Sequence, residues 1–395
     1  MAELKLSVRG QGVLLFTAGG DTCAFVLTSS AESKLESKLD ESDCLLVAWT
    51  GSGVSVRRRS APEPYPGANT GKGLVADARA FYWFSLDAQN CRLRAGVGEA
   101  RAETAVYECK LPAATDAERR ESKAFLESLT GFGAFTGAAP LRLLRDPVGR
   151  APPLRVEPSA TLDALAAGLH LPATHLAPVA RQMFDCVAGC RLDTDDFPEF
   201  SRAVAASIAG GWCRKRLAEK ADEFSKTDPN PAETYLRITL GENTGESPGV
   251  PYVLEIWPAG HFSPTHSHAN AEAIIKVLHG DIEVQLYPYL GPSAAPFAIT
   301  EFTAGDVMWI SPTLNQVHRL TNRGAEPCVT IQCYTYDRGD RAHYDFFDYL
   351  DKSVVKQYTP DSDMEFSAFK ALMRTEWESA ANGSAARGPL ACFGF

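Results

Sequence analysis

The sequence predicts a mainly β protein with an N-terminal β-sandwich, a helical segment, a small antiparallel β-barrel and a C-terminal helix. Three observations predict this order. Short apolar runs separated by Gly, Asp and Ser recur through residues 1–113, as in a sandwich. The apolar spacing becomes helical over residues 114–225. Residues 226–350 return to short alternating runs between glycine turns, which is typical of an antiparallel barrel, and residues 351–395 are expected to form a helix and tail.

The composition narrows the class of protein. The 395 residues are 45% apolar and 22% charged, which is ordinary for a globular chain with ample core. A net charge of −10 argues against a general nucleic-acid binder. No apolar run approaches the ~18 residues of a membrane span, and the N-terminus lacks the apolar region of a secretory signal. The ten cysteines include no CxxC pair, so we expect reduced thiols and a cytoplasmic location.

The N-terminal region is predicted to be an accessory domain. Its segments at residues 81–87 (FYWFSLD) and 91–99 (CRLRAGVGE) are among the expected strands. These segments are similar to the small β-domain named after farnesoic acid O-methyltransferase, which carries no methyltransferase motif. A sandwich appended to an enzyme is usually a binding or dimerisation module, so we expect one of these roles here.

The middle region is predicted to pack on the barrel. Residues 116–126 have the composition of a helix start, and residues 131–137 form a Gly-rich break. Residues 176–188 and 197–220 have the apolar periodicity of amphipathic helices. We expect these helices to cover one side of the barrel.

The barrel region contains three histidines with the spacing of a metal site. His266 and His268 are one residue apart, and residues i and i+2 of a strand point to the same face. His318 follows later in the chain, after the apolar run at residues 307–310. A lone strand histidine is usually a satisfied polar residue. Because two strands meeting across a barrel bring such residues together, we expect His266, His268 and His318 to bind one metal ion.

The motifs around these histidines resemble those of a known family. The pattern G-x5-H-x-H at Gly260–His268 and the later G…H-x3-N ending at Asn322 resemble the two cupin motifs. Within the cupins, the similarity is to the cysteine dioxygenase group of thiol dioxygenases. It covers residues 215–350, and its supporting segments are HSH at 266–268, IIKVLHGDIEVQLY at 274–287, VHRLTN at 317–322 and TYLRITL at 234–240.

The resemblance implies a fold, a cofactor and a reaction. The fold is the cupin barrel, a double-stranded β-helix or jelly-roll. The cofactor is Fe(II), held by His266, His268 and His318. The reaction is the oxidation of a small thiol carboxylate, cysteine foremost, by O2 to the sulfinate. Three neutral nitrogens leave half of an octahedral iron open for a thiolate, an amine and O2.

The resemblance also implies roles for residues on neighbouring strands. Arg237 stands where the family keeps an arginine for the substrate carboxylate, and Tyr235 shares its face and is expected to line the same pocket. Thr330, Gln332 and Tyr334 stand where the family alternates Ser, His and Tyr. Tyr334 would donate a hydrogen bond to bound oxygen or substrate. Gln332 departs from the family's histidine, which weakens a proton-relay role.

Two further departures leave alternatives open. Ala273 stands where animal members carry a cysteine cross-linked to the active-site tyrosine, so this cross-link cannot form. Many cupins use a glutamate shortly after the HxH pair as a fourth ligand, and Glu272 holds that place. Simple alternation from His268 turns Glu272 inward, whereas a bulge turns it out.

The alternatives are therefore a lyase or oxidase with a His3Glu metal site, or a non-catalytic cupin that serves as a binding module. The substrate could also be 3-mercaptopropionate or a larger thiol. The sequence leaves the oligomeric state open.

Overall fold

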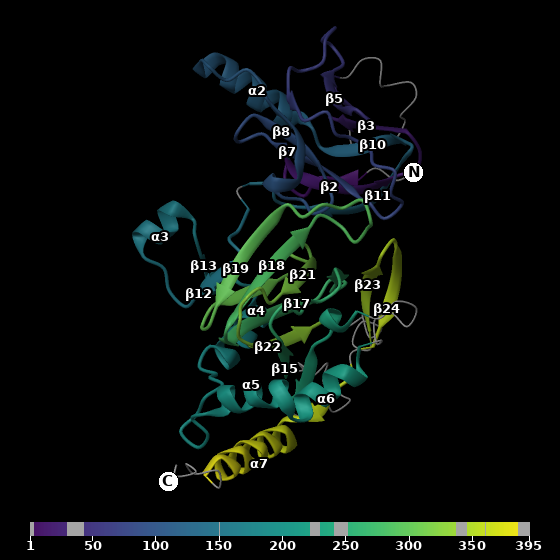
Figure 1. Ribbon diagram of the computed structural model, residues 1–395. Coiled ribbons are helices and arrows are strands. Elements are labelled where there is room, and N and C mark those ends of the chain that lie inside the picture. Colours follow the sequence, from purple (N-terminus) through teal and green to yellow (C-terminus); the bar gives the residue numbers. More distant parts are fainter. Residues whose placement is uncertain are drawn as a thin grey trace, which may run out of the picture. The chain divides into compact units, whose positions relative to one another are not determined.

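The computed structural model divides into two compact units (Figure 1). The first comprises Met1–Ala151 with Gly291–Phe297, and the second comprises Pro152–Leu290 with Ala298–Phe395. The structure describes residues 4–29, 43–149, 151–221, 230–240, 252–336, 346–359 and 361–385.

The first unit is a β-sandwich of two antiparallel sheets, as predicted. The five-stranded sheet has the order β1 (Leu4–Lys5), β10 (Gly131–Thr136), β3 (Thr22–Thr28), β4 (Leu45–Thr50) and β5 (Gly53–Arg58). The six-stranded sheet has the order β11 (Ala138–Leu144), β2 (Gln11–Ala18), β7 (Tyr82–Asp87), β8 (Arg92–Val97), β9 (Ala105–Lys110) and β6 (Ala68–Asn69).

Aromatic side chains fill the space between these two sheets. Phe16 of β2 contacts Phe25 of β3 with ring centroids 5.3 Å apart, and both rings are buried. Trp49 of β4 meets Tyr82 of β7 at 5.3 Å. Both pairs are edge-to-face, the arrangement that the ring quadrupoles favour. The period-two alternation of the strands therefore closes the sandwich over an aromatic core.

The segment after the sandwich strands differs from the expected helical region. Helix α2 (Asp116–Ser128) begins with a capping box between Thr115 and Glu118. Residues 131–137 were expected to be a break between helices, but they contain β10, which pairs with β1 and β3. Phe132 on β10 is fully buried, so this apolar strand completes the sandwich instead of starting another helix.

The second unit is a barrel made of two facing sheets. The eight-stranded sheet has the order β13 (Leu171–Pro172), β12 (Arg155–Glu157), β20 (Val307–Ile310), β17 (Glu272–His279), β22 (Cys328–Thr335), β15 (Tyr252–Trp257), β14 (Leu236–Thr239) and β25 (Met364–Glu365). The six-stranded sheet has the order β19 (Ala298–Thr303), β18 (Asp281–Tyr287), β21 (Val317–Thr321), β16 (His266–Ser267), β23 (Phe347–Asp351) and β24 (Val354–Tyr358).

The strand order of this barrel is that of a cupin. Strands β15, β17, β20 and β22 belong to one sheet, and the intervening β16, β18, β19 and β21 belong to the other. The chain therefore passes repeatedly between two sheets, which is the double-stranded β-helix. This confirms the predicted fold class of a mainly β chain with a cupin jelly-roll and an N-terminal sandwich.

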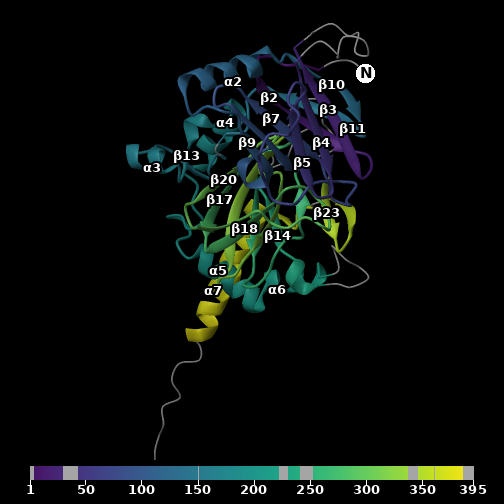
Figure 2. The same cartoon turned by 90° about the horizontal axis from the view of Figure 1, so that it is seen from above.

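Helices cover the outer face of the eight-stranded sheet. They include α4 (Pro178–Val187), α5 (Phe200–Gly210), α6 (Trp212–Glu219) and α7 (Phe366–Ala385). Helix α3 (Leu162–Ala167) has no buried residue, and the short turns η2 (Ala173–His175) and η3 (Pro231–Glu233) precede α4 and β14. Phe369 of α7 packs against Phe200 of α5 at 6.0 Å and Trp212 of α6 at 5.8 Å, and Figures 1 and 2 show these three helices together. Within the described ranges, no helix is long and apolar enough to span a bilayer.

One buried lysine joins these helices to the sheet. Lys276 lies on β17, and its ammonium donates to the carbonyl oxygens of Val187, at 3.3 Å, and Cys190, at 2.9 Å. It also donates to the carbonyl oxygen of Ala188. These carbonyl groups lie at and just after the C-terminal end of α4, where a cation is favoured by the helix dipole.

Candidate metal centre

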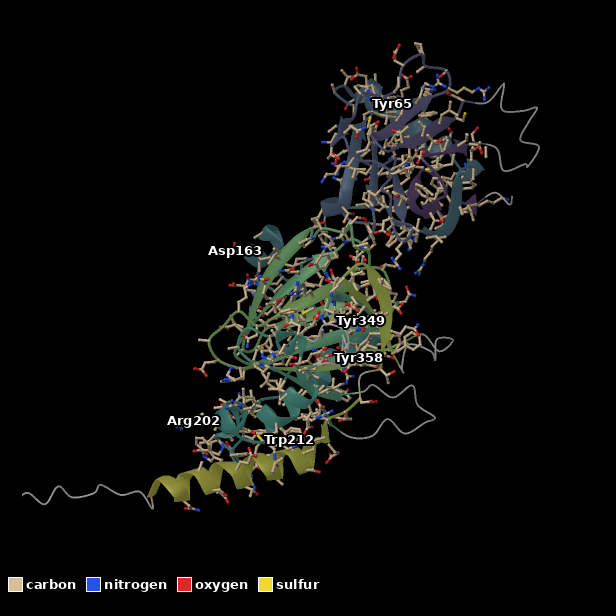
Figure 3. All side chains as sticks on the ribbon, turned by 45° about the vertical axis from the view of Figure 1, so that its right-hand side comes forward. Tyr65, Asp163, Arg202, Trp212, Tyr349 and Tyr358 are labelled. Carbon is tan, nitrogen blue, oxygen red and sulfur yellow. The ribbon has the colours of Figure 1, made fainter. Side chains whose placement is uncertain are left out.

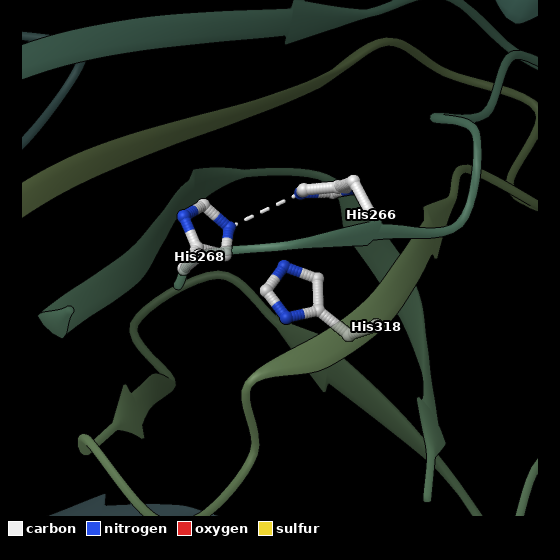
Figure 4. A group of neighbouring side chains, drawn as sticks. All are labelled: His266, His268 and His318. Carbon is white, nitrogen blue, oxygen red and sulfur yellow. Dashed lines mark hydrogen bonds between the residues drawn. The ribbon is translucent and has the colours of Figure 1, made fainter. Parts of the chain in front are cut away.

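The three histidines of the sequence motif converge inside the barrel (Figure 4). Strands β16 and β21 are antiparallel neighbours, and their register places His266 directly opposite His318. His268 follows β16, and its backbone N–H donates to the carbonyl oxygen of Gln316. One ring nitrogen from each histidine lies within 4.8 Å of the others. The predicted group of His266, His268 and His318 therefore forms one cluster.

The hydrogen bonds of the rings leave lone pairs for a metal. Nδ1 of His266 lies 3.0 Å from the carbonyl oxygen of Pro264, and Nδ1 of His318 lies 3.4 Å from that of Asn315. A carbonyl oxygen accepts only, so each Nδ1 is the protonated nitrogen and each Nε2 keeps its lone pair. Nε2 of His318 and Nδ1 of His268 are buried and have no hydrogen-bond partner among the described residues.

The spacing of these nitrogens fits a metal ion. Nε2 of His266 and Nε2 of His268 are 3.1 Å apart. Two imidazole nitrogens bound at right angles, each about 2.1 Å from a metal, are separated by about 3 Å. A buried nitrogen without a partner is costly unless something binds it. The residues present therefore fit a transition metal held by three imidazoles.

Burial keeps all three rings neutral at pH 7. It lowers the pKa of His266 to about 4, against the weak opposing effect of the hydrogen bond to Pro264. Burial also lowers the pKa of His268 and of His318 well below the usual value, and the neighbouring rings lower it further. Because a metal binds the neutral imidazole, this environment favours the ligating form.

Glu272 lies on the other face of the sheet. Ala269 and Asn270, between His268 and Glu272, have φ angles of 44° and 70°. These left-handed residues interrupt the strand alternation. Ala273 is the cross-strand partner of Tyr334, which faces the histidines, so Glu272 points away from them. Among the described residues, the group of potential metal ligands contains the histidines without Glu272, whose pKa burial raises to about 7.

Aromatic rings enclose the histidines. The ring of Tyr334 on β22 stacks on His268, with centroids 4.9 Å apart and planes 14° apart. Phe347 on β23 contacts His268 at 4.9 Å and His266 at 6.0 Å. Farther along the same sheet, Tyr349 and Tyr358 lie next to each other (Figure 3). This surrounding is apolar and restricts access of water to the cluster.

A buried chain of hydrogen bonds runs inward from Tyr334. The Tyr334 hydroxyl donates to Oε1 of Gln332, and Nε2 of Gln332 donates to Oε2 of Glu255. Nε2 of Gln332 also lies 3.2 Å from Oγ1 of Thr330. Nη1 of Arg237 donates to Oε1 of Glu255 at 3.1 Å. The structure thus places Tyr334, Gln332, Thr330 and Arg237 in one network.

Glu255 is the member of this network that sequence reasoning missed. It is the inward charged residue of an otherwise apolar strand, YVLEIW, and it lies opposite both Arg237 and Thr330 in the strand register. Burial raises its carboxyl pKa to about 7, although Arg237 and Lys220 oppose the rise. A glutamate within an apolar strand segment indicates a buried polar site, but its partners cannot be identified without the register between neighbouring strands.

Arg237 and Tyr235 are held firmly in place. The backbone N–H of Arg237 donates to Oδ2 of Asp363 at 2.8 Å, and Lys220 donates to the same oxygen at 2.8 Å. Tyr235 stacks on Trp257 with centroids 4.2 Å apart. The indole Nε1 of Trp257 lies 3.5 Å from Oγ1 of Thr330, so Tyr235 joins the network through the indole.

Comparisons with solved structures give similarity over about a quarter of this chain. No family model matches the sequence. The chain is similar to the Cupin_2 domain of an XRE family transcriptional regulator from Enterobacter cloacae, with 13% identity over 26% of this chain and 98% of that chain and a TM-score of 0.22. It is similar to an uncharacterised double-stranded β-helix protein from Klebsiella pneumoniae, with 20% identity over 29% of this chain and 86% of that chain and a TM-score of 0.21. It is also similar to an oxalate oxidase in complex with the substrate analogue glycolate, with 19% identity over 26% of this chain and 52% of that chain and a TM-score of 0.22.

The strand order and the histidine cluster together define the class of protein. The second unit is a cupin barrel whose interior presents three neutral imidazoles that fit a metal ion.

Proposed function

We propose that this protein is an iron-dependent thiol dioxygenase that oxidises a small thiol carboxylate, cysteine foremost, with O2 to the sulfinate. The observation that carries the proposal is the three-histidine cluster, which includes no carboxylate ligand among the described residues. Three neutral nitrogens leave three positions of an octahedral Fe(II) open. When bound there, Fe(II) would lower the pKa of a thiol and hold its sulfur next to dioxygen.

The protein's own residues would bind and orient the substrate. His266, His268 and His318 would hold the metal. Arg237 has five N–H donors, and one of them is used in the described bond with Glu255. The other donors suit a substrate carboxylate, provided that the carboxylate shares Arg237 with Glu255. Phe347, together with the ring of Tyr334, would exclude water from the reacting atoms.

The orientation of Glu272 favours this reaction over the alternatives with a His3Glu site. A lyase or an oxalate-type oxidase of that kind requires a fourth, carboxylate ligand. Glu272 points to the opposite face of β17. A non-catalytic binding module is the remaining alternative, and the metal content of the protein separates it from the enzyme.

We propose a cytoplasmic location and small-molecule partners. A thiol substrate and the enzyme's own cysteines stay reduced in the cytoplasm. The acidic net charge of −10 supports partners other than nucleic acid.

The test is thiol-dependent oxygen consumption. Protein loaded anaerobically with Fe(II) is mixed with O2 and cysteine, 3-mercaptopropionate or cysteamine, and the sulfinate is followed by mass. We expect oxidation of a thiol carboxylate, little oxidation of cysteamine, and none by His318→Ala. Oxidation of non-thiol acids alone would establish the oxidase or lyase alternative. Stoichiometric iron without any turnover would favour a binding module.

A further inference from the structure

We propose that Glu255 is a positioning residue that sets the direction of the hydrogen bond at Tyr334, so that the Tyr334 oxygen accepts a hydrogen bond from a ligand of the metal centre. The resemblance implied that Tyr334 donates to the ligand. The hydrogen-bond network runs from the charged pair of Arg237 and Glu255, through the amide of Gln332, to the neutral phenol of Tyr334. Each group determines which end of the next hydrogen bond donates.

The charged end is the pair of Arg237 and Glu255. Both side chains are buried, with 7% and 5% exposure, and Nη1 of Arg237 lies 3.1 Å from Oε1 of Glu255. A guanidinium only donates hydrogen bonds, and an ionised carboxylate only accepts them. At a pH above its raised pKa of about 7, the Glu255 carboxyl is ionised and presents an acceptor to every neighbour.

The middle of the chain is the amide of Gln332, which has one donor end and one acceptor end. Its Nε2 is directed at Oε2 of Glu255, and it also lies 3.2 Å from Oγ1 of Thr330. A flipped amide would point its oxygen at the carboxylate, and two acceptors would then repel each other. Glu255 thus orients the amide, and its Oε1 is left facing the Tyr334 hydroxyl.

The neutral end is Tyr334, which has a single hydroxyl hydrogen. Because Oε1 of Gln332 only accepts, the Tyr334 hydroxyl must donate its hydrogen to it. The remaining positions on the tyrosine oxygen are lone pairs. The ring stacks on His268, so this oxygen belongs to a side chain that lines the metal centre.

The direction of the network has a consequence for the substrate, which rests on the proposed function. A ligand group that reaches the Tyr334 oxygen must itself donate a hydrogen bond. Among small thiol carboxylates, an amino group provides that donor. The site therefore favours an aminothiol carboxylate such as cysteine over a mercapto acid without an amine.

The isosteric variant Glu255→Gln reverses the network. The oxygen of the new amide would accept from Arg237, and the NH2 group of the new amide would donate to Gln332. The Gln332 amide would then turn its own NH2 group to Tyr334, whose hydrogen becomes free for a ligand. Glu283→Gln is the matched control, because Glu283 pairs with Arg323 away from the network.

The direct test is Raman spectroscopy of metal-free protein at a pH above the Glu255 pKa of about 7, so that this carboxyl is ionised. The intensity ratio of the tyrosine Fermi doublet distinguishes a phenol that donates a hydrogen bond from one that accepts. The contribution of Tyr334 is the difference between each protein and its Tyr334→Phe counterpart. We expect a donor signature in the wild type and in Glu283→Gln, and an acceptor signature in Glu255→Gln. The same signature in the wild type and Glu255→Gln would overturn the proposal. Should Glu255→Gln not fold, Arg237→Met/Glu255→Met removes the acceptor that orients Gln332 without leaving an unpaired cation. The donor signature of Tyr334 should then weaken, and an unchanged donor signature would overturn the proposal.

Kinetics test the consequence for the substrate separately. With Fe(II)-loaded protein, kcat/KM is measured for cysteine and for 3-mercaptopropionate. The ratio of the cysteine value to the 3-mercaptopropionate value should be about tenfold lower in Glu255→Gln than in the wild type, as expected for the loss of one hydrogen bond. An unchanged ratio would contradict the amine preference. If the wild type oxidises neither thiol, the proposed function fails, whereas the Raman result still decides the role of Glu255.

Discussion

The two units of this protein are both built from facing β-sheets, but their interiors differ in chemistry. The sandwich encloses rings such as Phe16, Phe25 and Trp49, which touch across the sheets. The barrel encloses imidazoles, a phenol, an amide and the ion pair of Arg237 and Glu255.

This difference indicates that the apolar interior of the sandwich serves stability, whereas the polar interior of the barrel serves chemistry. Burying an aromatic side chain stabilises a fold by removing apolar surface from water. Burying an ionisable group costs free energy unless it is paired, and even a well-made buried ion pair contributes little compared with apolar packing. We infer that the barrel keeps its polar interior for binding and catalysis, and the following changes test that contrast.

The largest expected effect is in the sandwich. Phe84 is fully buried and contacts Phe25 at 5.7 Å and Phe132 at 6.5 Å. Phe84→Ala should lower the free energy of unfolding of the first unit by about 3–5 kcal/mol, because it removes apolar contacts and leaves a cavity. Denaturant unfolding measures this loss. Metal binding by the barrel should be unchanged, and the exposed control Leu141→Ala should have little effect.

A comparable loss is expected when the ion pair of the barrel is broken from one side. Glu255→Leu should lower stability by about 3–5 kcal/mol, because it leaves Arg237 as an unpaired buried cation. The double variant Arg237→Met/Glu255→Leu should recover most of that loss. Thermal unfolding of the three proteins measures both values. If the double variant were no more stable than the single one, the pair itself would be a main source of stability.

The histidines should make the metal-free protein sensitive to acid. Their folded-state pKa values lie below the unfolded value of 6.5, so their contribution is complete above pH 6.5 and falls as pH drops towards 4. His266 alone accounts for about 3 kcal/mol over that range. Glu255 and Glu272 have raised carboxyl pKa values and oppose the trend. The difference between the wild type and a variant with all three histidines changed to Gln isolates the effect, and a pH-independent difference would contradict it.

A smaller effect is expected on the outer face of the barrel. Lys276→Met removes the ammonium that binds the last carbonyl groups of α4, and it should cost about 1–3 kcal/mol. Lys356→Met, at a partly exposed pair with Asp351, is the control and should change stability much less, because surface ion pairs contribute little. Equal effects of the two substitutions would show that Lys276 does not anchor the helix.

The parts of the fold that depend on local pattern could be predicted from the sequence. The one-residue spacing of His266 and His268 indicates a shared face, and the cupin motifs add His318. The short alternating runs indicate the sandwich and the barrel. These signals are local because strand periodicity is read directly from the order of residues.

The remaining features depend on contacts between distant segments. The role of Glu255 requires the register that aligns it with Arg237 and Thr330. The orientation of Glu272 depends on two left-handed residues, Ala269 and Asn270, of types that do not require this conformation. Strand register and local backbone conformation depend on tertiary contacts, so the local pattern of a single sequence does not predict them.

The central claim is that His266, His268 and His318 bind one transition metal, and metal stoichiometry tests it most directly. Chelator-treated protein is loaded anaerobically with Fe(II), desalted and measured by mass spectrometry of the metal. We expect one iron per chain in the wild type and in the control His261→Ala, whose ring lies outside the cluster. His318→Ala should retain less than about a tenth, since even losing a supporting contact to a ligand costs 10–100-fold in affinity. A wild type without stoichiometric iron, or a His318→Ala variant that keeps it, would contradict the account.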